Sequence, residues 1–400
     1  MAAYFGGVLS SMMTTLLFVF LIAALGYLLG AVEIKGISLG TAGVLLVALL
    51  FGILASRVGA FEVGGRTIVL FNTETVKPMY SLISNLGTAM FVTAVGLIAG
   101  PKFFRNFNRE SISYVLMGFI VILCGVAVTV IIKLLSGISS SLAVGLMTGA
   151  LTSTPGLSAA KDAAMDPDAA TAGYGIAYLF GVLGVVLFVQ LMPRVEHIDI
   201  VRERRRFTGS SANARPIHPD KVRKRLDSFD FTPFMLTVVL GLIIGSIKIP
   251  GINFSLGSSG GTLVAGLIVG HFGHVGNIDL SVNKHTLNFF RELGLVLFLV
   301  GAGVPGGVNF VKYVRVSYFI YGALMTLLPM SVGFLLGKYV FRLSIFNDLA
   351  SLTGGMTSTP ALGTLINVAG TDEVAAAYAA TYPIALVLVV LAAKLLVAVF

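Results

Sequence analysis

Hydrophobic residues fall into long runs along the chain, each close to the length that a helix needs to cross a bilayer, about 20 residues. In the first half, runs lie near 8–30, 38–56, 81–100 and 112–135, followed by a polar-interrupted segment at 139–160 and a run at 172–193. In the second half, runs lie near 232–247, 256–273, 289–305 and 313–337, followed by an interrupted segment at 348–369 and a run at 374–398. This pattern predicts an all-α polytopic membrane protein.

The two halves have the same order of elements, and small residues match between them. Positions at a constant offset of 207 pair Leu86, Gly87, Phe91 and Gly96 with Leu293, Gly294, Phe298 and Gly303. The consistent order of such matches indicates an internal duplication. We therefore expect a first membrane repeat at 1–193, a linker at 194–229 and a second membrane repeat at 230–400.

The two interrupted segments share the four residues Thr-Ser-Thr-Pro. One copy is Thr152–Pro155 and the other is Thr357–Pro360, 205 positions later. A helix in lipid carries proline and a run of hydroxyls only where nearby groups satisfy the freed backbone. Breaks at corresponding positions of two halves are the strongest sequence indication of a transporter binding site.

The interrupted segments either cross the membrane or turn back within it. If they turn back, each half has five crossings plus one re-entrant hairpin, and the halves are inverted. If they cross, each half has six crossings and the halves are parallel. Both segments are short, carry proline and glycine at their middle and are rich in small polar residues, which favours re-entry and an inverted repeat.

Composition and charge support the membrane assignment. The chain is 56% hydrophobic and 11% charged, with a net charge of +9. Of its 27 lysines and arginines, ten lie between Arg194 and Arg225. A basic loop between membrane regions is typical of a cytoplasmic segment, so we expect a multi-pass protein of the bacterial inner membrane that contacts lipid and binds no nucleic acid.

The repeated motif predicts the chemistry of the site. Proline suits the first turn of a helix, and a preceding hydroxyl residue caps it, so each motif predicts a turn and a new half-helix whose N–H groups attract an anion. The alternative is a kinked helix whose hydroxyls bond only its own backbone. Two tyrosine pairs, Tyr174 with Tyr178 and Tyr378 with Tyr382, begin the last run of each half. The predicted substrate-binding residues are Thr152, Ser153, Thr154, Pro155, Gly156, Thr357, Ser358, Thr359, Pro360, Ala361, Tyr178, Thr381 and Tyr382.

Other charged and small residues have ordinary structural interpretations. Arg291 with Glu292 is expected to open a span, Asp348 to cap the second interrupted segment and Lys394 to reach the lipid headgroups. We expect no buried acidic residue, which weakens the case for proton coupling. GxxxG pairs such as Gly26 with Gly30 and Gly241 with Gly245 predict close helix packing.

The chain resembles the aspartate–alanine exchanger family of bacterial inner-membrane permeases in GLMTGALTSTPGLSAAKDA, in LTGGMTSTPALGTLINVAG and in TYPIALV, which follows the second. The resemblance covers both halves and implies secondary exchange of amino acids or carboxylates. Members of that family typically carry two potassium-channel-like regulatory domains between the halves, whereas here only the basic linker fills that place. The resemblance therefore implies neither that regulation nor a particular substrate.

These observations predict a secondary transporter that exchanges a small anionic or zwitterionic substrate. We expect elevator-like alternating access, a site at the two hairpin tips and a homodimer, with no cofactor, no metal ion and no enzymatic activity. One alternative is a sodium- or proton-coupled carboxylate symporter. An alternative of another class is a non-transporting membrane sensor or an intramembrane enzyme.

Overall fold

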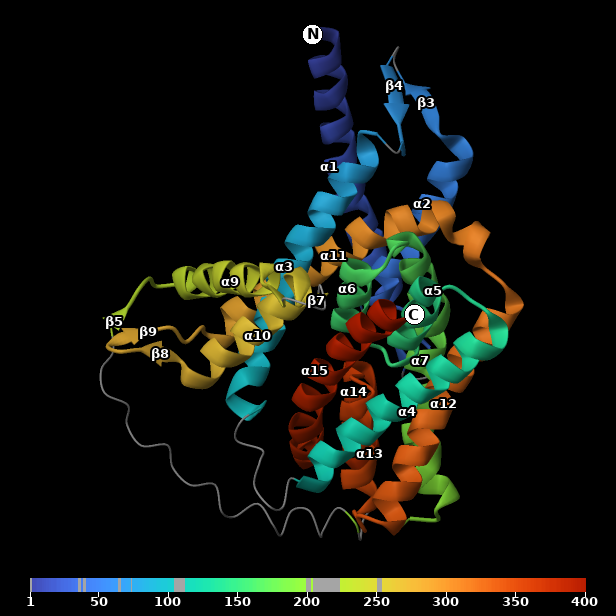
Figure 1. The fold of residues 1–400 in the computed structure, drawn as a ribbon, viewed down its shortest axis with the longest axis vertical. Helices are drawn as coiled ribbons and strands as arrows, with labels where there is room; N and C mark the ends of the chain where they lie inside the picture. Colours follow the sequence, from blue (N-terminus) through green and yellow to red (C-terminus); the bar gives the residue numbers. More distant parts are fainter. Residues whose placement is uncertain are drawn as a thin grey trace.

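The computed structural model describes residues 2–34, 37–38, 41–63, 66–72, 74–103, 112–198, 203, 224–249 and 254–400. Most of the predicted linker at 194–229 lies outside these residues, and the three-part division of the chain stays a prediction. The described fold is helical, with short strand pairs in the connections (Figure 1).

In the first half, the described residues form seven helices. They are α1 (Ala2–Gly30), α2 (Ala42–Val58), α3 (Val76–Phe103), α4 (Ile112–Ser136), α5 (Ser140–Ala150), α6 (Thr154–Ala163) and α7 (Pro167–Val195). Two antiparallel strand pairs join its first three helices: β1 (Glu33–Ile34) with β2 (Ile37–Ser38), and β3 (Ala60–Val63) with β4 (Arg66–Val69).

The second half repeats this order. Its helices are α9 (Phe231–Ser246), α10 (Gly257–Phe272), α11 (Lys284–Tyr313), α12 (Val316–Tyr339), α13 (Ile345–Gly355), α14 (Thr359–Ala369) and α15 (Ala375–Val399), with the 3-10 turn η1 (Asp372–Val374) before α15. Its strands are β5 (Lys224–Arg225), β6 (Lys248–Ile249), β7 (Phe254–Ser255), β8 (His274–Val275) and β9 (Ile278–Asp279); β6 pairs with β7, and β9 pairs with both β5 and β8.

These helices confirm the all-α polytopic membrane fold. Among the described residues, six helices are long and apolar enough to cross a membrane, namely α3, α4, α7, α11, α12 and α15. The apolar helices α2 and α9 have 17 and 16 residues. Both segments that carry the Thr-Ser-Thr-Pro motif are broken helices, and each break falls at the motif.

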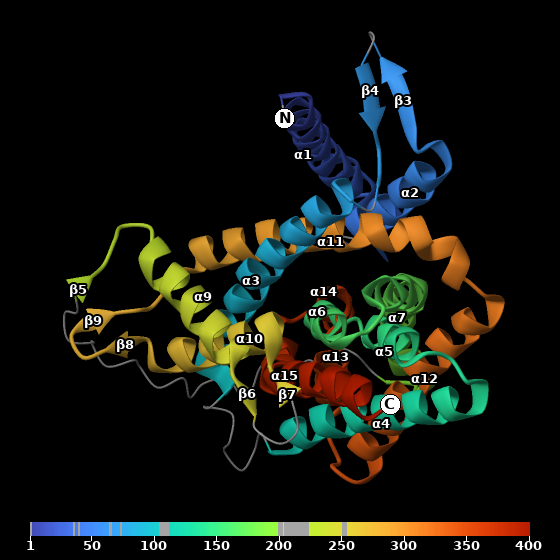
Figure 2. The same cartoon turned by 45° about the horizontal axis from the view of Figure 1, so that its top comes forward.

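The helices form two modules, and each half contributes to both. The framework module consists of α1–α3 and α9–α11, in which α3 packs along α10 and α11. The hairpin module consists of α4–α7 and α12–α15, in which α5 packs on α7 and α13 on α15. Figure 2 shows α3 and α11 lying across the hairpin helices. The modules meet mainly where α11 contacts α7, α10 contacts α6 and α15 contacts α3.

Each broken segment is a helical hairpin that returns to the end at which it starts. In the first hairpin, α5 and α6, the backbone N–H of Asp166 donates to Ser141 Oγ over 3.3 Å, which joins the start of α5 to the start of α7. In the second hairpin, α13 and α14, Gly354 at the end of α13 lies against Tyr378 and Tyr382, and α13 also contacts η1 just before α15. The long helix that follows each hairpin therefore runs parallel to its first arm.

The two hairpins start from opposite ends of the hairpin module. Helix α15 begins at the open end of the second hairpin and runs for 25 residues. Near its other end, Lys394 Nζ lies 3.9 Å from Asp162 Oδ2, at the open end of the first hairpin. The halves are thus arranged as an inverted repeat with their hairpin tips facing each other.

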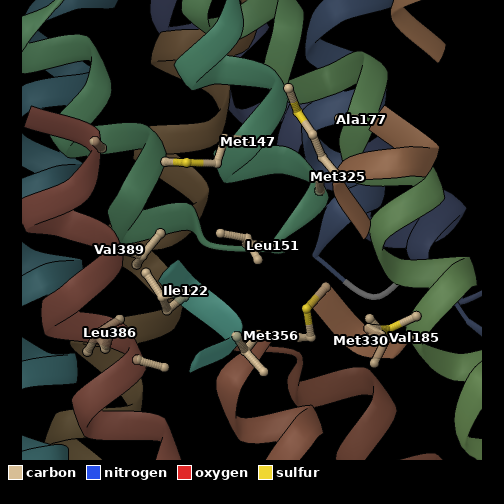
Figure 3. Close-up of a cluster of buried hydrophobic side chains, with 14 of the residues drawn as sticks. Ile122, Met147, Leu151, Ala177, Val185, Met325, Met330, Met356, Leu386 and Val389 are labelled. Carbon is tan, nitrogen blue, oxygen red and sulfur yellow. The ribbon is translucent and has the colours of Figure 1, made fainter. Parts of the chain in front are cut away.

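Glycine pairs bring the framework helices into close contact, as the GxxxG pattern predicts. A Cβ at Gly43 would lie 2.3 Å from the carbonyl oxygen of Gly26, and one at Gly261 would lie 2.2 Å from that of Gly241. The hairpin module has its own apolar core around the tips (Figure 3), in which Leu151 and Met356 are both fully buried.

Candidate functional site

The two hairpin tips are joined by a reciprocal pair of hydrogen bonds. Thr152 Oγ1 donates to the carbonyl oxygen of Met356 over 2.7 Å, and Thr357 Oγ1 donates to that of Leu151 over 3.0 Å. Both threonines have positive φ, 53° and 51°, a left-handed conformation that β-branched residues rarely adopt. The cross-bonds hold this turn in both halves, so both copies of the motif meet at one place.

The serines of the motif occupy equivalent positions but make different contacts. Ser153 caps α6, because its Oγ accepts from the N–H of Gly156 over 3.1 Å. Ser358 precedes α14 in almost the same backbone conformation, yet it makes no capping bond, and its buried Oγ has no hydrogen-bond partner among the residues that the structure describes. A buried hydroxyl without a partner is costly and therefore indicates a place for a ligand or water.

In the first half, the other predicted site residues are packed at a closed contact with the framework. Thr154 Oγ1 lies 3.2 Å from the hydroxyl of Tyr174, which stacks beside Tyr178 with ring centroids 4.9 Å apart. Pro155 and Gly156 are buried in the first turn of α6. Both tyrosines pack against the apolar cluster that includes α2 and α11.

In the second half, the predicted residues lie in two different surroundings. Tyr382 stacks on Tyr378, with ring centroids 5.3 Å apart, and lines a cavity. Thr381 faces α4, and its hydroxyl donates to the carbonyl oxygen of Tyr114 in α4 and to that of Ala377 in its own helix. Ala361 is fully buried in α14. The side chains of Thr359 and Pro360 lie outside the described residues.

A cavity of about 240 Å³ separates the second hairpin from the framework. Among the described residues that line it, Arg291 has the only charged side chain. Helix α14 contributes Leu362 in its first turn, four residues after Ser358, which makes no capping bond. The full set of lining residues is Val95, Ile98 and Ala99 of α3, Arg291 of α11, Leu362 of α14, and Ala375, Tyr378, Ala379, Tyr382 and Pro383 of α15. An apolar cavity with one cation and two phenol rings suits a small organic anion.

Three sequence interpretations of charged residues were wrong. Arg291 and Glu292 lie two turns inside α11, because the helix begins at Lys284. Asp348 does not cap α13, since Ser344 accepts from the N–H of Asn347 and fills that role. Lys394 is 4% exposed and points toward Asp162 instead of reaching the headgroups.

The expectation that no acidic residue is buried is also wrong. Asp348 is 1% exposed, and its Oδ1 has no hydrogen-bond partner. It lies against α12, where a Cβ added at Gly337 would come within 2.0 Å of this oxygen. The residue escaped sequence reasoning because its position near a helix start is typical of a capping carboxylate.

Metal ligation has no support among the residues that the structure describes, since they contain no group of three or more His, Cys, Asp or Glu residues placed to hold an ion. The spacing of Gly301, Gly303 and Gly306 matches the GxGxxG pattern of dinucleotide-binding turns. These glycines lie within α11 and not in the strand-to-helix turn that such a site needs.

Comparison with known proteins finds the same two-part membrane region. A family model described as a predicted permease membrane region matches residues 18–194 and 233–398. The two matched segments correspond to the two halves of the structure and leave out the basic linker.

Similar proteins occur in distant bacteria and bear the name of uncharacterized transporters. One from Bacteroides fragilis is 27% identical, over 93% of this chain and 96% of its own length. One from Rhodopirellula baltica is 27% identical over 96% and 99%, and one from Corynebacterium glutamicum is 24% identical over 94% and 96%. The alignment with the Bacteroides protein spans 531 positions, whereas this chain has 400 residues. More than 130 residues of the Bacteroides protein therefore have no counterpart in this chain.

Proposed function

The chain belongs to the aspartate–alanine exchanger family of permeases, and on that premise we propose that it is a secondary transporter exchanging small amino acids or carboxylates. The family and the six apolar helices of membrane-spanning length among the described residues show a multi-pass membrane transporter. We further propose that it lies in the bacterial inner membrane.

The observation that carries the proposal is the meeting of the two tips. Thr152 and Thr357 bond across to the opposite tip, and half-helices α6 and α14 begin beside that contact. Helix N-termini attract carboxylates through their free N–H groups and their dipole. Ser358, buried at the start of α14 with no hydrogen-bond partner among the described residues, would supply a further hydrogen bond to the bound anion.

The two modules suit an elevator-like mechanism. In this proposal the hairpins enter the membrane from opposite faces and carry the substrate, and the hairpin module moves against the framework module. An empty site leaves Ser358 and the N–H groups of α14 poorly paired, whereas a bound carboxylate pairs them. Movement of the empty carrier is then slow, which favours exchange over net uptake. A homodimer stays a prediction.

Uptake by the purified protein in liposomes tests the proposal. Radiolabelled L-aspartate, L-alanine and succinate are each supplied to vesicles that are empty or loaded with the same compounds. We expect strong stimulation by internal substrate, lost in Ser358→Ala and kept in Ser246→Ala, whose exposed hydroxyl bonds only its own helix at Ile243. Absence of uptake for all compounds under both conditions would contradict the proposed substrate class.

Asp348 favours a second candidate function, proton-coupled symport. It is a buried carboxyl group whose Oδ1 has no hydrogen-bond partner among the described residues, which makes it the candidate carrier of a coupled proton. Uptake into empty vesicles that depends on an imposed proton gradient, and is abolished in Asp348→Asn with loaded exchange intact, would replace obligatory exchange by symport. Equal behaviour of wild type and Asp348→Asn would leave exchange as the function.

A further inference from the structure

Two cations lie at the contacts between the hairpins and the framework. Arg291, on α11, lines the cavity beside the second hairpin. Its Nη2 lies 2.8 Å from Oε1 of Glu292, and the two side chains are 38% and 41% exposed. Arg291 therefore has an exchangeable partner, its own neighbour, which an incoming anion can replace.

The repeat register relates Arg291 to the first hairpin. At the offset of 207 that aligns α3 with α11, Arg291 corresponds to Ser84. The ammonium group of Lys161, on α6, lies 3.0 Å from Ser84 Oγ. Lys161 itself corresponds to Ile366 at the hairpin offset of 205. The cation at the first contact is thus supplied by the hairpin, whereas the cation beside the second hairpin is supplied by the framework and lines the cavity between them.

Lys161 has no close counter-ion among the described residues. The ion pairs of that part of the chain join Asp162 to Lys394 and Asp168 to Lys77, and none places a carboxylate within 4 Å of Lys161. Its ammonium lies instead 5.4 Å from the centre of the Phe298 ring. Lys161, an ionisable side chain whose hydrogen bond goes to the neutral Ser84, is therefore a candidate functional residue.

We propose that Arg291 and Lys161 are alternating anchors for the carboxylate group of the substrate, one for each access state. Arg291 faces the open cavity in the state described here. Lys161 takes the same role when the first hairpin separates from the framework and an equivalent cavity opens there. The inference rests on the proposed exchange function and extends it to residues outside the repeated motif.

Charged thiol reagents test this anion preference without a known substrate. In a Cys124→Ala background, Leu362→Cys lines the open cavity, and Leu157→Cys occupies the equivalent position of the first hairpin, one turn from Lys161. Each variant in sealed vesicles is treated with 2-sulfonatoethyl or 2-trimethylammonioethyl methanethiosulfonate from either side. Ser84→Cys replaces Leu157→Cys if the latter fails to fold.

We expect the Leu362→Cys variant to react from one side, faster with the anionic reagent. Adding Arg291→Gln should lower the ratio of anionic to cationic rates on the order of tenfold, as removal of one nearby charge in a medium of intermediate dielectric predicts. The Leu157→Cys variant should react from the other side and also faster with the anionic reagent. Adding Lys161→Gln should lower this preference for the anionic reagent. Lys312→Gln, an exposed cation at the far end of α11, is the matched control.

The outcomes separate this inference from the exchange function. Unchanged rate ratios in Arg291→Gln and Lys161→Gln, with exchange intact, would overturn the anchors and leave exchange standing. Reaction of both cysteine variants from the same side would overturn the alternation. Charge-dependent ratios in a protein that exchanges no amino acid or carboxylate would support the anion anchors and reject the proposed exchange.

Discussion

The first and second hairpins have the same motif and the same turn but different contacts with the framework. Two hydrogen bonds close the first hairpin against α3, from Ser158 to Thr88 over 3.2 Å and from Lys161 to Ser84 over 3.0 Å. The second hairpin borders a cavity of about 240 Å³ at its contact with the same framework helices. Similar backbones thus support a closed contact on one side and an open one on the other.

In the proposed alternating-access mechanism, this difference between the halves sets the direction in which the site faces. If both halves made identical contacts, the site would be equally accessible from both faces. Because the halves are similar in fold, each is able to adopt the contacts that the other shows. Exchanging the closed and open contacts between them gives the opposite-facing state. Four predictions test how far the two hairpins are equivalent.

The largest expected effect is on the packing of the first hairpin. Gly145 corresponds to Ala350, and a Cβ at Gly145 would lie 2.1 Å from the carbonyl oxygen of Ala170. Gly145→Ala forces two backbones apart and should cost about 3 kcal/mol, whereas Ala350→Gly should cost about 1 kcal/mol. Thermal unfolding in detergent measures both. A Gly145→Ala variant as stable as the wild type would show that α5 is free to separate from α7.

The second prediction contrasts the two motif serines. Ser153→Ala removes the cap of α6 and should lower stability by about 1 kcal/mol. Ser358→Ala removes no bond within the protein and should leave stability unchanged, but it should weaken substrate binding roughly ten- to a hundred-fold. Melting curves with and without substrate distinguish these outcomes. Equal effects of both variants on binding would mean that the two N-termini contact the substrate alike.

The third prediction concerns the reciprocal threonine hydrogen bonds, which the two tips make alike. Thr152→Val and Thr357→Val keep the side-chain shape and remove one cross-bond each. Each should lower stability by about 1 kcal/mol, the net contribution of an ordinary hydrogen bond. Both variants are compared by thermal unfolding. A large difference between them would indicate that the tips are not held symmetrically.

The sequence predicts much of the fold, because backbone constraints in lipid act locally. Each break in the interrupted segments falls at the motif, and the glycine pairs at Gly26 and Gly241 mark close helix contacts. Hydropathy alone left the choice between crossing and returning open. In the structure, the bond between Asp166 and Ser141 joins the start of α5 to the start of α7, so the first broken segment folds back on itself.

The differences within the candidate site were beyond sequence reasoning for a physical reason. Ser153 and Ser358 occupy identical motifs, and only their tertiary surroundings distinguish a capping hydroxyl from an unpartnered one. Arg291 was placed at a helix end because the apolar run begins near 289, whereas α11 begins at Lys284 with mostly polar residues, two turns before Arg291. Helix starts outside an apolar run leave little signal in hydropathy.

The smallest expected effects compare the two tyrosine pairs. Tyr174→Phe removes a 3.2 Å hydrogen bond to Thr154 in the closed contact and should cost roughly 0.5–1 kcal/mol of stability with exchange preserved. Tyr382→Phe removes a hydroxyl from the cavity wall and keeps the stacking on Tyr378, so stability should hold. Its apparent affinity for the exchanged anion should fall by less than about fivefold, the loss expected for one neutral hydrogen bond. Loaded-vesicle exchange and thermal unfolding are measured on both variants. If Tyr174→Phe impaired affinity and Tyr382→Phe impaired stability, the assignment of a closed first contact and an open second contact would be contradicted, because the two contacts would then be reversed in the membrane.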